Sequence, residues 1–122
     1  MLTVAEKLKQ MGINRIRFAD TVGVLNPSKC SRAIEDLIKY AEVEIEMHAH
    51  NDLGMAVANS ISAAKSDAKY IDTTILGIGE RAGNCNFSQL IYASDRIFDW
   101  GISYLECLEV EKIFSSTIKY YS

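Results

Sequence analysis

The chain contains two histidines, His48 and His50, which lie two positions apart in the stretch MHAHND. Side chains at positions i and i+2 of a β-strand point to the same face of a sheet. The run from Val43 to His50 predicts such a strand, so both imidazoles should project together at its carboxyl end. Converging imidazoles are suitable ligands for a divalent metal. Two histidines on a strand can equally be ordinary surface residues, and their spacing alone leaves both interpretations open.

Asn51 and Asp52 follow directly, where the next helix is expected. Either residue can cap that helix, or Asp52 can orient a ligating histidine through its other ring nitrogen. Further polar residues lie at the ends of the neighbouring predicted strands: Asp20, Thr21, Thr73, Thr74, Glu80, Arg81 and Asn84. The active sites of parallel α/β barrels lie at the carboxyl ends of the strands. We therefore expect these side chains to converge.

Helical and strand patterns alternate along the chain, which predicts parallel strands joined by helices. Strands are expected over residues 13–20 and 43–50, residues 69–79 are expected to hold a third strand and its exit loop, and residues 84–86 are a candidate fourth strand. Helices are expected over residues 1–11, 27–40, 53–66, 88–100 and 108–121. Asn26 followed by Pro27 is a typical helix start, because proline lacks only an N–H that would be unpaired there anyway. The sequence predicts an α/β fold of about four βα units.

Composition narrows the class of protein. Hydrophobic residues make up 48% and charged residues 24%, as in ordinary globular proteins, and this excludes a disordered chain. A net charge of −3 argues against a nucleic-acid-binding surface. We expect no membrane span and no export signal, and therefore a cytoplasmic protein with reduced thiols. The three cysteines lack any CxxC spacing, which disfavours a zinc site built from cysteines.

Three segments, FADTVGVLNP, IEMHAHNDLGMAVANS and LGIGERAGN, occur in an order and spacing that resemble one enzyme family. This is the alpha-isopropylmalate synthase and homocitrate synthase family, whose metal-dependent TIM-barrel enzymes include 3-hydroxy-3-methylglutaryl-CoA lyase. Residues 45–58 contain the HxHNDxGxAxA pattern of its signature. Within the family, RIRFADTVGVLNP is most similar to the homocitrate synthases of nitrogen-fixing bacteria.

The resemblance implies a site at the matching positions. His48, His50 and Asn84 would hold a divalent metal, namely zinc, magnesium or manganese. Thr21 would donate a hydrogen bond to the carboxylate of a 2-oxo acid. The implied reaction joins acetyl-CoA to 2-oxoglutarate and yields homocitrate, which serves in building the iron-molybdenum cofactor of nitrogenase.

The resemblance also places a loop over the site. Glu80 and Arg81 would shape this loop, although a salt bridge within the turn is an equally good interpretation. Asp52 would lie behind the metal ligands as a supporting residue. The family takes its catalytic base from a C-terminal lid, so no catalytic base is assigned in this chain.

A complete (β/α)8 barrel needs about 250 residues, and this chain has 122. Residues 1–100 therefore resemble strands five to eight of a barrel, and residues 101–122 a helical extension without the lid. The family's Asp-Arg-Glu-like run on the first strand is absent. We expect a second subunit to supply the N-terminal half-barrel, because a half-barrel alone would expose two sheet edges and an apolar inner face.

Other interpretations stay open at this stage. The chain can be part of an isopropylmalate or citramalate synthase, since residues that select the substrate fall mostly outside it. It can also be a non-catalytic half-barrel that regulates a complete synthase, or a truncated product without function.

Overall fold

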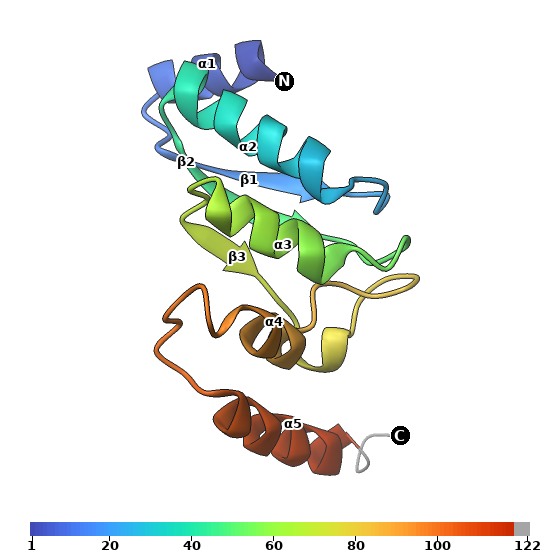
Figure 1. Ribbon diagram of the computed structural model, residues 1–122. Coiled ribbons are helices and arrows are strands. Elements are labelled where there is room, and N and C mark those ends of the chain that lie inside the picture. The colour runs from blue at the N-terminus through green and yellow to red at the C-terminus, as the bar shows by residue number, and fades with distance from the viewer. Residues whose placement is uncertain (119–122) are drawn as a thin grey trace.

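The computed structural model describes residues 1–118, in which three parallel strands are joined by helices that cover one face of the sheet (Figure 1). The sheet order is β1-β2-β3, with bounds Arg15–Asp20, Glu44–Ala49 and Tyr70–Asp72. The helices are α1 (Leu2–Gln10), α2 (Pro27–Ala41), α3 (Ala56–Lys65), α4 (Phe87–Ser94) and α5 (Tyr104–Ile118), with a 3₁₀ turn η1 (Ile75–Gly77). This arrangement agrees with the predicted α/β half-barrel. No helix within residues 1–118 is long and apolar enough to cross a membrane.

Helix α2 begins where the sequence predicts. The Asn26 side chain accepts a hydrogen bond from the Lys29 backbone N–H at 2.9 Å, and Pro27 occupies the first helical position. The helix ends at Ala41, after which Glu42 adopts a left-handed conformation with φ 51°. Its buried face consists of Cys30, Ile34, Leu37 and Ala41.

The core lies between the sheet and helices α2 and α3. Strand β2 alternates strictly, so that Ile45, Met47 and Ala49 are fully buried beneath the helices. Helix α3 faces them with Ala56 and Ala63, whose small side chains allow the helix backbone to approach the strands closely. The core therefore fixes the opposite side chains of β2, which include His48, on the uncovered face.

Residues 84–86 do not form the fourth strand that the sequence suggested. They make isolated bridges, between His50 and Asn84 and between Thr74 and Asn86. A turn with left-handed residues precedes them, including Arg81 (φ 55°) and Gly83 (φ 92°), and this backbone conformation does not continue a ladder.

Helix boundaries near the C-terminus also differ from the prediction. Helix α4 ends at Ser94 instead of residue 100, and it is followed by a turn in which the Ser94 carbonyl accepts from the Ile97 and Phe98 N–H groups. Helix α5 begins at Tyr104 instead of residue 108. Ser103 and Glu106 cap it reciprocally, with Ser103 N–H donating to Glu106 at 2.8 Å and Glu106 N–H donating to Ser103 at 3.3 Å. The predicted end of this helix, residues 119–121, lies outside the described residues.

The uncovered face of the sheet is polar, which corrects the expectation of an apolar inner face. Arg17 contacts Glu46 at 2.7 Å, and Arg15 lies 3.8 Å from Glu44 on the neighbouring strand. The Arg15 guanidinium also stacks 3.5 Å from the ring centre of Tyr70. These charges alternate with core residues along β1 and β2, so the face can contact water without a large apolar exposure.

Candidate metal and substrate site

The two histidines meet at the carboxyl end of β2, as their spacing predicts. Their Nε2 atoms lie 3.2 Å apart, and the rings are nearly perpendicular at 79°. Two nitrogens bound to one zinc ion at about 2.0–2.1 Å in tetrahedral geometry are separated by about 3.3 Å. The observed separation therefore suits two ligands of a single ion.

Asp72 is the carboxylate that orients His48. Strands β2 and β3 place the two residues directly opposite each other, and His48 Nδ1 lies 2.8 Å from Asp72 Oδ2. A proton held at Nδ1 by this contact leaves the Nε2 lone pair free toward His50. Asp72 thus takes the orienting position for which the sequence offered Asp52.

Asn84 joins the two histidines. It is 8% exposed, forms a backbone bridge with His50, and places its amide nitrogen 3.4 Å from His48 Nε2. The amide oxygen and nitrogen exchange places by a half-turn of the side chain, so this group can present an oxygen to the same point. Gly79 makes room for it, because a methyl group there would lie 1.6 Å from the Asn84 amide oxygen.

The donor set fits a divalent ion as part of a coordination shell. The Nδ1 atom of His50 is buried with no hydrogen-bond partner in the described part of the chain. The Nε2 atoms of His48 and His50 converge with the Asn84 amide. Within residues 1–118, no group of three His, Cys, Asp or Glu side chains is arranged to hold a metal. Catalytic zinc sites use three protein ligands and keep a fourth position open, and the two imidazoles and the amide supply three donors, none of them a carboxylate.

Arg81 connects its own turn to the loop that follows β1 and to the loop that follows β2, beside the histidines. Its Nε donates to Asp52 at 2.7 Å, while one Nη donates to Asp52 at 3.0 Å and to the Thr21 carbonyl at 2.8 Å. The hydrogen bond from Arg81 lowers the pKa of Asp52 below its usual value. Glu80 lies 3.6 Å from Arg81 and is 82% exposed, so the salt bridge within the turn exists but is secondary.

Asp52 neither supports a histidine nor caps α3, because its carboxylate is engaged by Arg81. The N-cap residue of α3 is Met55, which makes no side-chain capping hydrogen bond, so Asn51 is not the cap either; its side-chain oxygen accepts from the N–H of the first helical residue, Ala56, at 3.2 Å. Helix α3 accordingly begins at Ala56, three residues later than the predicted start at residue 53.

Thr21 lies at the end of β1 and is exposed. Its hydroxyl makes no hydrogen bond within residues 1–118, so it is free to contact a bound molecule, whereas its carbonyl is used by Arg81. Asp20 is structural, because its carboxylate accepts from the Val24 and Leu25 N–H groups, both at 3.1 Å.

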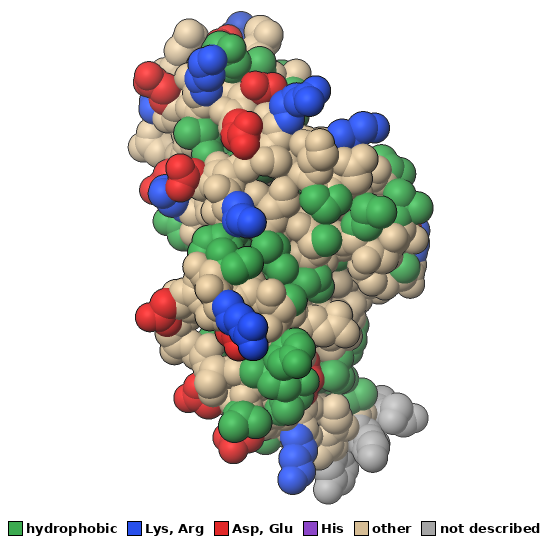
Figure 2. Space-filling view, viewed as in Figure 1, with side chains coloured by type: hydrophobic (Ala, Val, Ile, Leu, Met, Phe, Trp, Pro, Cys, Tyr) green, Lys and Arg blue, Asp and Glu red, His purple; other side chains and the backbone are tan. Residues whose placement is uncertain are grey.

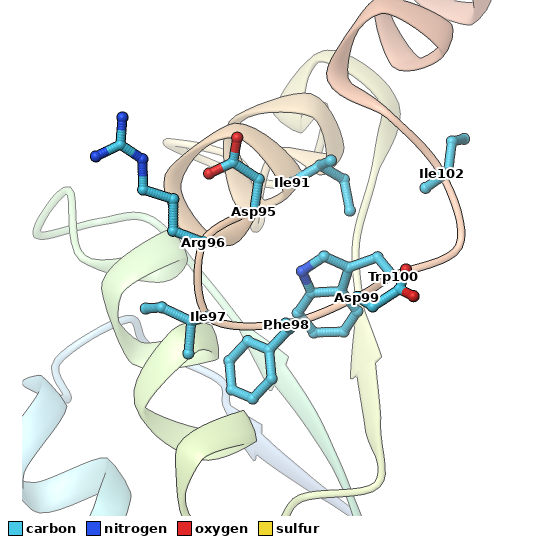
Figure 3. A pocket seen from close by; sticks show the side chains of 8 residues that line it. All are labelled: Ile91, Asp95, Arg96, Ile97, Phe98, Asp99, Trp100 and Ile102. Carbon is cyan, nitrogen blue, oxygen red and sulfur yellow. The ribbon is translucent and has the colours of Figure 1, made fainter.

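A hollow of about 390 Å³ lies elsewhere, between α4 and the segment that follows it. Figure 3 shows Phe98 and Trp100 beside it, with Asp95 and Arg96 at its rim. In Figure 1 this segment lies on the side where the strands begin, whereas His48 lies within β2 near its carboxyl end and His50 directly after it. The hollow is therefore separate from the histidine site.

Comparison with curated proteins gives three informative relatives. The homocitrate synthase subunit alpha of Clostridium pasteurianum is 42% identical over 91 residues, which are 75% of this chain and 34% of the relative. Homocitrate synthase 1 of Nostoc sp. is 37% identical over 118 residues, which are 95% of this chain and 31% of the relative. The 2-isopropylmalate synthase 2 of Caldanaerobacter subterraneus is 40% identical over 104 residues, which are 84% of this chain and 27% of the relative. The chain spans about a third of the length of the curated relatives it matches.

Solved structures confirm the fold. The HMG-CoA lyase of Bacillus subtilis superimposes with a TM-score of 0.83 at 21% identity, over 97% of this chain and 42% of that one. The pyruvate carboxylase of Rhizobium etli superimposes with a TM-score of 0.86 at 17% identity, over 95% of this chain and 12% of that one. The HMGL-like family matches residues 1–111. The motif-based assignment is thus confirmed, and this chain belongs to the HMGL-like family.

Proposed function

We propose that this chain is a subunit of a homocitrate synthase, which condenses acetyl-CoA with 2-oxoglutarate. The observation that carries the proposal is the meeting of His48, His50 and Asn84 at the carboxyl end of the sheet. Homocitrate synthases stand among the most similar curated relatives, at 37% and 42% identity. In the reaction, the acetyl methyl group loses a proton and bonds to the 2-oxo carbon, and water then cleaves the thioester to release CoA.

Each residue of the site has a task in this proposal. The two histidine Nε2 atoms and the Asn84 amide oxygen hold a divalent cation, namely zinc, magnesium or manganese. When bound, this cation supplies Lewis-acid polarisation of the substrate's 2-oxo group. Asp72 fixes the proton of His48 on Nδ1, and the Thr21 hydroxyl donates to the carboxylate of the 2-oxo acid. No residue of this chain is assigned as the base.

A partner completes the site in this proposal. Within residues 1–118, no strand pairs with the outer edge of β1, and an apolar groove of about 240 Å³ lies beside it, lined by Val4, Leu8 and Phe18 among others. An open edge next to an apolar groove suits a further strand and helix. We propose that residues 1–100 form a half-barrel and residues 101–122 an extension. A cytoplasmic partner would supply the N-terminal half-barrel and, from the Asp-Arg-Glu-like run on its first strand, a carboxylate ligand for the cation.

The test begins with purification of the chain from its native source and identification of the protein that accompanies it. Homocitrate formation is then measured with each protein alone and with the mixture. We expect activity in the mixture only. A partner that is fully active by itself, and unaffected by this chain, contradicts the proposal.

A variant separates a catalytic subunit from a scaffold. His48→Ala is expected to abolish homocitrate formation by the mixture, since a ligand is lost. Glu44→Ala is the matched control, because Glu44 lies on the same face of β2 and is exposed. Equal activity of both variants indicates a regulatory half-barrel. The 40% identity to a 2-isopropylmalate synthase makes that activity the second candidate, so the same mixtures are assayed with the branched-chain 2-oxo acid.

A further inference from the structure

A small polar cavity adjoins the histidine cluster and shares Asn84 with it. Its volume is about 130 Å³, and its polar lining comes from Asn51, Asn84, Asn86 and Gln89. A water molecule occupies about 30 Å³ of liquid, so the cavity has room for a group of a few heavy atoms. It lies between the GERAGN turn and the start of α4.

The cavity offers hydrogen-bond donors. The Asn51 oxygen already accepts from the Ala56 N–H at 3.2 Å. The Asn86 oxygen already accepts from the Gln89 N–H and from the Ser88 hydroxyl, each at 3.0 Å. The NH₂ groups of Asn51 and Asn86 have no hydrogen-bond partner within residues 1–118. These two NH₂ groups favour a ligand that brings an acceptor.

Gly77 keeps one of these donors accessible. It has φ +68°, and a methyl group there would lie 3.6 Å from the Asn86 amide nitrogen and 3.2 Å from its Cβ. A side chain at this position would cover the Asn86 NH₂ group. Glycine at position 77 thus allows the left-handed backbone of the turn and leaves the cavity open to the Asn86 NH₂ group.

The lining is uncharged, and this selects the kind of acceptor. No Asp, Glu, Lys, Arg or His lines the cavity. The nearby Arg81 is engaged by Asp52 and by the Thr21 carbonyl. No cationic side chain lines the cavity to offset the cost of enclosing a carboxylate or phosphate, whereas an amide carbonyl needs only N–H donors.

We propose that this cavity binds an amide carbonyl of the pantetheine arm of acetyl-CoA through the NH₂ groups of Asn51 and Asn86. This inference rests on the proposed function, which supplies acetyl-CoA as a substrate. Because Asn84 is common to the cavity and the histidine cluster, an arm held here brings its acetyl end beside the polarised 2-oxo group. The cavity would thus position the thioester for attack.

The test uses isosteric variants that keep the fold. Asn86→Asp and Asn51→Asp retain the oxygen that accepts from the helix N–H and replace the NH₂ donor with an oxygen. Aspartate is as good a helix cap as asparagine, so α4 should still form. Asn26→Asp makes the same change at the cap of α2, outside the cavity, and is the control.

Binding of pantetheine to the full chain is measured by saturation-transfer NMR. We expect Asn86→Asp and Asn51→Asp to raise its Kd about tenfold, which corresponds to about 1.4 kcal/mol, and Asn26→Asp to leave it unchanged. Absence of pantetheine binding to the wild type overturns the inference, as does an equal Kd for all variants. Competition by glutarate, with loss of its binding in Asn86→Asp, overturns it in favour of a carboxylate subsite. Pantetheine binding without homocitrate formation leaves the cavity assignment intact and refutes the proposed function instead.

Discussion

At the scale of single residues, the contact between His48 and Asp72 distinguishes a prepared ligand from a surface histidine. Their 2.8 Å contact fixes where the ring proton lies. Asp72→Asn replaces the acceptor-only carboxylate with a neutral amide, whose NH₂ group can donate to Nδ1 and thereby allows the ring to change tautomer. Loss of such a supporting carboxylate typically weakens metal affinity 10–100-fold. We expect this loss for Asp72→Asn when zinc is titrated against a chromophoric chelator.

Asp52→Asn is the control for that measurement. Asp52 is also a carboxylate at this edge of the sheet, but it pairs with Arg81 and makes no hydrogen bond to a histidine within residues 1–118. Its affinity for zinc should match that of the wild type. Equal affinities of the two variants would show that Asp72 has no role in preparing the ligand.

The buried thiols predict how stability depends on pH. Burial raises the pKa of both Cys30 and Cys85 from 9.0 to about 11. Below pH 9 the thiols carry protons in the folded and unfolded chain alike. Between pH 9 and pH 11 the unfolded chain releases them first, so the folded chain binds more protons and stability falls as the pH rises. The loss is on the order of 1–3 kcal/mol for each thiol.

Urea unfolding at pH 8 and pH 10.5 measures this loss. The Cys30→Ala, Cys85→Ala double variant is the comparison, since all other ionisable groups are common to both proteins. Its free energy of unfolding should fall less with pH than that of the wild type. The same dependence in both proteins would assign the effect to other groups.

At the scale of elements, the three loops at the carboxyl edge are held by one tight contact. Gly23 has φ +64°, and a methyl group on it would lie 2.4 Å from an Asp52 carboxylate oxygen. Gly54, on the neighbouring loop, has φ +69° and nothing within 4 Å of that position. Alanine at either site adopts a left-handed conformation at a cost of about 1–2 kcal/mol. Only Gly23→Ala must also displace the Asp52–Arg81 pair.

We therefore expect Gly23→Ala to destabilise the chain about twice as much as Gly54→Ala in urea unfolding. The comparison isolates the close approach from the backbone conformation, because the two glycines share the same φ. Equal losses would mean that the loops separate freely and that the Arg81 contact does not define the edge.

The elements show which features local sequence patterns can predict. Spacing within a few residues predicts the start of helix α2 at Asn26–Pro27. It also predicts the strand that carries the histidines and the face that they share. The choice of Asp72 over Asp52 depends on the register of β2 against β3, which is a long-range property. The polar uncovered face did have a signal, since charges alternate at Arg15 and Arg17 and at Glu44 and Glu46. The S-x-x-E start of α5, from Ser103, was another available signal.

At the scale of the whole molecule, exposed apolar side chains gather at several places within residues 1–118, and two of them bear on association. Figure 2 shows green side chains grouped near the α5 end of the chain, where Tyr92, Leu105 and Ile113 are each more than 60% exposed. The second place is the groove between α1 and β1, where Val4 is 62% exposed. Only the second adjoins an open strand edge, so it combines apolar contact with unpaired backbone groups.

That combination predicts association of the isolated chain through β1. An open edge with adjacent apolar surface tends to pair with another strand, and a second copy is the partner present in a pure sample. Sedimentation velocity should show an average mass that rises with protein concentration. Val4→Asp introduces a charge into the groove and should shift the sample toward monomer, while Thr3→Asp, at an exposed position on the same helix, should not. A wild-type chain that stays monomeric at every concentration would show that the edge is protected by its own charges, in which case completion of the barrel requires contacts that only a dedicated partner provides.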